Sequence, residues 1–160
     1  MNINIEYGWL DKENKKHLNT IKGFRENYQT TSLQKVLESG IANCIEQAKL
    51  IKTFFDKMNI ENKMYCYRSY ETEENFAKEV HMHCFVLYKY QNNWYHFEHA
   101  NEPERGIIKY ETLTAALKQI TSGYEKNDIR KLAEIPDIPE GLSFKEFNNY
   151  VNHFEAIHLN

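Results

Sequence analysis

An apolar stripe in residues 44–58 constrains the fold of this chain more than any other feature. Its members recur at intervals of four and three residues: Cys44, Ala48, Ile51, Phe55 and Met58. This spacing places them on one face of an α-helix. Asn43 is a suitable N-cap, and the polar residues 59–62 close the element. We therefore predict a helix that begins at Cys44 and packs the face carrying it against another layer.

Patterns typical of β-strands follow this helix. Residues 64–70 are rich in aromatic side chains, and residues 80–90, 94–99 and 106–110 have strand-like composition. The polar, acidic residues 71–78 are expected to form a loop, and residues 91–93 supply a turn. These features predict an antiparallel sheet.

The register of the hairpin decides which residues share a face. If its turn has an even number of residues, with Lys89 opposite Trp94, His83 becomes a diagonal neighbour of Glu98 on one sheet face. A slip by two residues would place these two side chains directly opposite each other. A three-residue loop would put them on opposite faces.

Helices are expected on both sides of this central region. Residues 10–24 have a helical pattern with Asp11 as N-cap, and a capping-box pattern at residues 31–34 opens a short helix that Gly40 ends. Residues 112–120 read as a further helix. A second capping box, formed by Ser143 and Glu146, opens a C-terminal one. We predict an α+β fold in which residues 1–160 form a single domain.

Composition restricts the class of protein. The chain has a net charge of −3, which gives no reason to expect nucleic acid or an anionic membrane as partner. It has no secretory signal pattern and no apolar run long enough to span a bilayer. Its three cysteines suit a reducing compartment better than a disulfide framework, so we expect a cytoplasmic protein. Cys66 and Cys84 are interpreted as buried structural thiols.

Cys44, His83 and Glu98 are the residue types of a cysteine nucleophile relay. The N-terminus of a helix favours a thiolate, an imidazole can pair with that thiolate, and a carboxylate can orient the ring. If the stripe that begins at Cys44 packs on the sheet face carrying His83, the sulfur approaches the imidazole. The backbone N–H of Cys44 is a natural oxyanion donor. A second donor is not evident, and Asn43 is the nearest candidate.

These segments resemble the transglutaminase-like cysteine enzyme superfamily, in particular its small bacterial and mobile-element members. Residues 44–50 (CIEQAKL) resemble its nucleophile helix, residues 83–88 (HCFVLY) its histidine strand, and residues 94–98 (WYHFE) its third motif. Residues 106–110 (GIIKY) resemble the downstream segment of the small members. The resemblance covers about residues 39–120. Glu98 stands where the family usually has Asp, and Ile45 stands where an aromatic residue often follows the nucleophile.

The resemblance implies a papain-like α+β core and acyl transfer through a thioester, without a metal or other cofactor. We hypothesise an enzyme acting on amide bonds of a peptide or protein. Cys44 would attack the carbonyl, His83 would pass a proton to the leaving amine, and Glu98 would hold the ring. Hydrolysis, by a peptidase or deamidase, is preferred over amine transfer because no sequence feature suggests an acceptor-amine site.

Two other classes of function stay open. His81, His83, His96 and Glu98 would project from one face of the hairpin, and three imidazoles with a carboxylate suit zinc. However, His81 and His96 would lie at opposite ends of the strand pair. The second alternative is a catalytically inactive transglutaminase-like module that uses its cleft to bind a peptide or protein. The oligomeric state is left open by the sequence.

Overall fold

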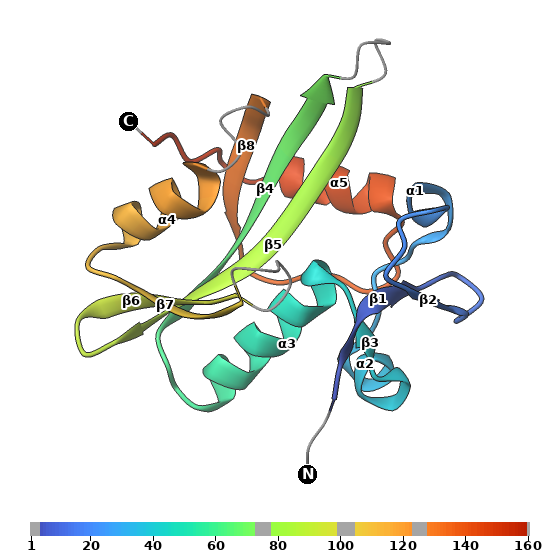
Figure 1. The fold of residues 1–160 in the computed structure, drawn as a ribbon, viewed down its shortest axis with the longest axis horizontal. Helices are drawn as coiled ribbons and strands as arrows, with labels where there is room; N and C mark the ends of the chain where they lie inside the picture. Colours follow the sequence, from blue (N-terminus) through green and yellow to red (C-terminus); the bar gives the residue numbers. More distant parts are fainter. Residues whose placement is uncertain (1–3, 73–77, 99–104, 123–127, 160) are drawn as a thin grey trace.

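The computed structural model describes residues 4–72, 78–98, 105–122 and 128–159. Within these ranges the fold is α+β, as predicted, with five helices, a five-stranded antiparallel sheet and a smaller three-stranded sheet (Figure 1). The order of the large sheet is β7-β6-β5-β4-β8, and that of the small sheet is β2-β1-β3. No helix among the described residues is long and apolar enough to cross a membrane.

The large sheet contains every strand predicted from the pattern. Its strands are β4 (Asn62–Thr72), β5 (Lys78–Tyr90), β6 (Asn93–Glu98), β7 (Gly106–Tyr110) and β8 (Asp128–Ile135). The turn between β5 and β6 has two residues, Gln91 and Asn92, which both have positive φ, at 47° and 64°. Two positive φ values are typical of the type I′ turns that suit the twist of a hairpin. Lys89 consequently lies opposite Trp94, which confirms the even-turn register.

β8 is the strand that the sequence did not predict. It pairs antiparallel with β4 and buries Leu132, Ala133 and Ile135. Residues 128–135 read DIRKLAEI, and their good helix formers and interspersed charges give no clear period of two. The pairing with β4 therefore outweighs the local propensity of the segment. Parts of two predictions, the middle of the acidic loop and His99, lie outside the described residues.

Helices cover both faces of this sheet. α3 (Cys44–Lys57) and α5 (Phe144–Asn152) share one core with Cys84 and Val86 of β5. α4 (Leu113–Ser122) packs through Ala116 and Leu117 on the other face, which carries Phe85 and Leu87. The caps explain where two of these helices begin. Asn43 caps α3 as predicted, and Ser143 with Glu146 forms the predicted capping box of α5.

The N-terminal region differs from the prediction. The expected helix over residues 10–24 is wrong, because β1 (Glu6–Leu10) and β2 (Lys16–Leu18) form a hairpin before the short α1 (Phe24–Asn27). Asp11 caps the hairpin turn instead of a helix, since its Oδ1 accepts from the backbone N–H groups of Glu13 and Lys15, each at 2.9 Å. Asn14 adopts the left-handed φ of 62° in this turn.

The next segment returns the chain to the small sheet. α2 (Leu33–Ser39) ends at Gly40, as predicted, and its N-cap is Ser32. β3 (Ile41–Ala42) then pairs parallel with β1 and leads directly into α3. Figure 1 shows this small sheet lying beyond the N-terminal end of α3. The start of α3 therefore lies between the two sheets.

Candidate active site

Cys44 occupies the first turn of α3. The Asn43 side chain fixes this turn, because its Oδ1 accepts from the backbone N–H of Ile45 at 2.8 Å. The Cys44 side chain is buried, and its Sγ lies 3.9 Å from the carbonyl oxygen of Met82 on β5. The helix N-terminus adds positive potential at this position, which favours an anionic sulfur.

His83 lies on the opposite face of β5 from α3. Its ring is stacked among aromatic rings, 5.4 Å from that of Tyr67 and 6.1 Å from that of Phe85. Phe85 belongs to the core under α4, whereas Cys44 belongs to the core under α3. The condition under which the sulfur was predicted to approach the imidazole, that α3 packs on the face carrying His83, is therefore not met.

Cys44 interacts with His83 although α3 packs on the other face of β5. Among the described residues, the ladder between β5 and β6 runs from the pair Leu87–His96 to the hairpin turn. At the level of Met82, β5 pairs with β4 on its other side. The sulfur contacts the Met82 carbonyl beyond the described end of this ladder.

The environment of His83 favours its charged form. Burial opposes the charge, but interactions with the Cys44 and Glu98 side chains, including the charges of both groups, raise the pKa of His83 to about 10. Its Nε2 lies 3.8 Å from Oε2 of Glu98, which is an ion-pair distance. Since Nε2 faces Glu98, Nδ1 is the ring nitrogen left for Cys44. Each of the side chains in the order Cys44, His83, Glu98 thus interacts with the next one. Cys44 comes from α3, His83 from β5 and Glu98 from β6.

His96 is a third member of this cluster, and it is in a different protonation state. Its Nε2 lies 3.5 Å from the same Glu98 Oε2. Burial first, and then the positive charge of His83, lower the pKa of His96 to about 4, although Glu98 acts in the other direction. A neutral His96 therefore flanks an ion pair between His83 and Glu98. His96 is buried on the same face as His83.

The zinc alternative finds no matching geometry. Among the described residues, no three His, Cys, Asp or Glu side chains converge as metal ligands. His81 instead lines a cavity that Cys44 also lines.

Tyr7 is a site residue that the sequence did not reveal. It is aligned with Ala42 in the pairing of β1 with β3, two residues before Cys44, and it lines the same cavity as Cys44. The charge of Cys44, then burial, then a hydrogen bond with the Cys44 side chain raise the pKa of Tyr7 far above 10. The phenol is consequently a hydrogen-bond donor at neutral pH. Only the β1–β3 pairing brings it to Cys44, and no sequence motif signals it.

The backbone N–H of Asn43, which the sequence suggested as an oxyanion donor, already has another partner. Its backbone N–H interacts with the buried carboxylate of Glu46, whose pKa it helps to lower. Glu46 also accepts from the Tyr28 hydroxyl at 2.5 Å and from the backbone N–H of Thr31 at 3.2 Å. Burial nevertheless dominates and raises the pKa of Glu46 to about 7.

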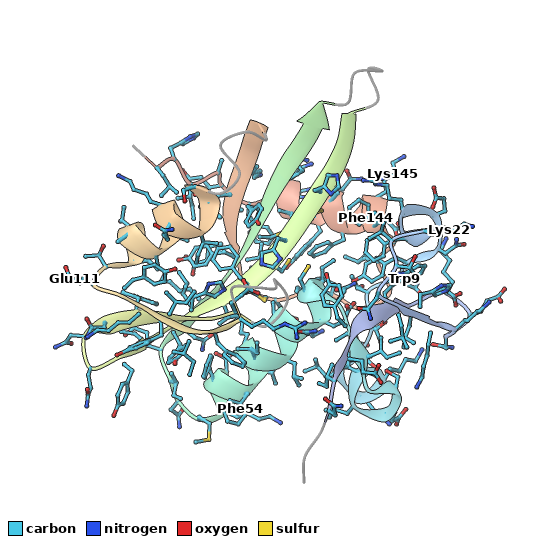
Figure 2. The ribbon with its side chains drawn as sticks, viewed as in Figure 1. Trp9, Lys22, Phe54, Glu111, Phe144 and Lys145 are labelled. Carbon is cyan, nitrogen blue, oxygen red and sulfur yellow. The ribbon has the colours of Figure 1, made fainter. Side chains whose placement is uncertain are left out.

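A cavity of about 510 Å³ opens beside the Cys44 sulfur. Its walls come from β1, the segment around Ile21, α1, the start of α3, the His81 region of β5 and Phe144. Trp9, Phe24 and Phe144 form an aromatic cluster in it, with neighbouring ring centroids 5.3 and 5.4 Å apart. Figure 2 shows Trp9 and Phe144 on the same side of the molecule, near α1. The size is typical of small-molecule sites.

Cys66 and Cys84 provide a contrast to Cys44. They lie opposite each other on β4 and β5, and both are fully buried free thiols, as expected from the sequence. Burial, together with Cys66, raises the pKa of Cys84 well above its ordinary value. These two thiols are therefore set up for packing rather than for attack.

No protein-family model matches this chain, and no curated protein matches it either. The resemblance to the transglutaminase-like superfamily therefore rests on the sequence motifs alone.

Proposed function

We propose that this protein is a cysteine-dependent acyl-transfer enzyme of the transglutaminase-like type, acting on amide bonds of a peptide or protein. One observation carries the proposal. His83 sits between Cys44 and Glu98, with its Nε2 3.8 Å from the carboxylate and its pKa raised to about 10, against the effect of burial, by both neighbours. A relay of thiol, imidazole and carboxylate is the arrangement that nucleophilic catalysis by cysteine requires.

The steps follow from the positions of the groups. The Cys44 sulfur attacks the amide carbonyl, an S–C bond forms, and the C–N bond breaks as His83 gives its proton to the leaving amine. Water then attacks the thioester, His83 takes a proton from it, and the carboxylic acid and the free thiol are released. Glu98 holds the ring in both protonation states and supports its positive charge whenever His83 is protonated.

Two groups are suited to stabilise the oxyanion. The backbone N–H of Cys44 lies in the first helical turn, where it has no partner within the helix. The Tyr7 hydroxyl supplies the second donor, since it stays protonated and lies beside the same residue. This assignment replaces Asn43, whose backbone N–H serves Glu46.

Alkylation by iodoacetamide tests the relay. An ordinary thiol, with a pKa of about 8.5, is only about 0.3% thiolate at pH 6. The proposed relay uses His83 to stabilise the attacking thiolate, although a stabilised thiolate is a weaker nucleophile. We therefore expect Cys44 to be alkylated at pH 6 roughly 10-fold faster in the wild-type protein than in His83→Ala. Mass spectrometry of the intact and digested protein gives the rate and the site.

The control is His153→Ala, which removes an exposed histidine at the end of α5. This variant should keep the wild-type rate at pH 6. Cys66 and Cys84 should stay unmodified in the folded protein because both are fully buried. Equal rates for wild-type and His83→Ala across pH 5–9 would leave a non-catalytic binding module as the better explanation.

A further inference from the structure

Cys44 belongs to two different surroundings. It interacts with His83, which pairs with Glu98, and neither His83 nor Glu98 lines the cavity of about 510 Å³. Cys44 is the residue that the relay and the cavity share. The leaving amine must face His83 to receive its proton. The cavity side is consequently left for the acyl part of the substrate.

The walls of the cavity determine which side chain fits. Trp9, Phe24 and Phe144 supply an aromatic cluster, and Ile21, with 79% of its surface exposed, stands at the mouth. Among the described lining residues there is no carboxylate, so a lysine or arginine side chain would have no ion-pair partner there. A large apolar side chain, in contrast, would be removed from water and packed against aromatic faces.

We propose that this cavity is the specificity pocket of the enzyme and that it takes an aromatic or large aliphatic side chain on the acyl side of the scissile amide. This inference rests on the proposed function, because it needs Cys44 as the nucleophile. It adds the substrate class, namely amides whose acyl residue is bulky and carries no positive charge.

Chloromethyl ketones test the pocket without a known substrate. In these reagents the thiolate displaces chloride from the methylene carbon, forming an S–C bond, so the rate reports both the nucleophile and the side chain beside it. Acetyl-phenylalanine, acetyl-lysine and acetyl-glycine chloromethyl ketones are compared, each rate being divided by the rate with glutathione. Burial of the benzyl group predicts that the phenylalanine reagent modifies Cys44 roughly 10- to 100-fold faster than the glycine reagent. The lysine reagent should exceed glycine by no more than about 3-fold.

Ile21→Glu places a charge at the mouth of the pocket without disturbing the core. It should reduce the phenylalanine-to-glycine ratio at least about 5-fold. The matched control is Ile107→Glu on β7, where the replaced side chain is 65% exposed and lies outside the cavity. This control should keep the wild-type ratio.

The two proposals fail in different ways. If iodoacetamide alkylation depends on His83 but the phenylalanine-to-glycine ratio is near one, or Ile21→Glu leaves that ratio unchanged, the pocket assignment is overturned and the nucleophile stands. If alkylation at pH 6 does not depend on His83, the proposed function itself is overturned.

Discussion

The buried carboxyl of Glu46 gives the sharpest test of the electrostatics around α3. It lies two residues after Cys44, has only 3% of its surface exposed, and its pKa is raised from 4.5 to about 7. The neutral acid is therefore favoured in the folded state. Its contribution to stability is complete below the unfolded pKa of 4.5 and is lost as the pH rises through about 7. At about 1.4 kcal/mol for each pKa unit, the loss is about 3 kcal/mol.

Glu46→Gln should remove this pH dependence. Glutamine has nearly the same shape and keeps an oxygen that accepts from Tyr28 and Thr31, but it does not ionise. Urea unfolding of both proteins at pH 4.5 and pH 8 measures the effect. The variant should gain about 3 kcal/mol relative to wild type between these two pH values. All other titrations, including that of His83, are common to both proteins and cancel in the difference.

Glu134→Gln is the control, since it removes a carboxyl at the surface that pairs with Lys63 at 3.0 Å. Exposed ion pairs contribute about 0–1 kcal/mol, so its stability should follow that of wild type within that range. Parallel stability curves for wild type and Glu46→Gln would refute the reasoning, because they would mean that the buried carboxyl titrates as it does in the unfolded chain.

Two further predictions concern the relay. Tyr7→Phe should slow acylation of Cys44 by p-nitrophenyl acetate roughly 100-fold, because that reaction passes through an oxyanion. Its alkylation by iodoacetamide, which forms no oxyanion, should change by less than about 3-fold, and equal losses in both reactions would contradict the donor role. Glu98→Gln and Cys44→Ala should each lower the pKa of His83, since each removes a group that raises it. Titration of the imidazole by NMR measures this, and an unchanged pKa in both variants would contradict the cluster described above.

The hairpin register could be predicted because strand geometry allows few alternatives. The alternation of side chains in β5 and β6 and a two-residue turn together fix His83 and Glu98 on one face. The start of α3 could be predicted for a similar reason, since Asn43 and the apolar stripe both point to it.

The N-terminal region could not be predicted in this way. Residues 10–24 contain good helix formers, and Asp11 suits a helix cap as well as a hairpin turn. Pairing of β1 with β3, a contact between distant segments, decides the outcome. Tyr7, the proposed second oxyanion donor, belongs to this region, and so do the cavity residues Trp9 and Ile21. Neither the donor nor the cavity could therefore be predicted from the sequence.

Cys44 and His83 interact although α3 packs on the opposite face of β5 from His83. Continued in the same register, the β5–β6 ladder would pair Phe85 with Glu98. Among the described residues the ladder instead ends at the pair Leu87–His96, and Glu98 lies 3.8 Å from the His83 ring on the same sheet face. A pattern of alternating side chains assigns residues to the two faces of a sheet, but it does not show where the ladder between two strands ends. For this reason Cys44 and His83 can form one site although they belong to opposite faces of the sheet and to different cores. Assigning residues to faces would not have predicted this contact.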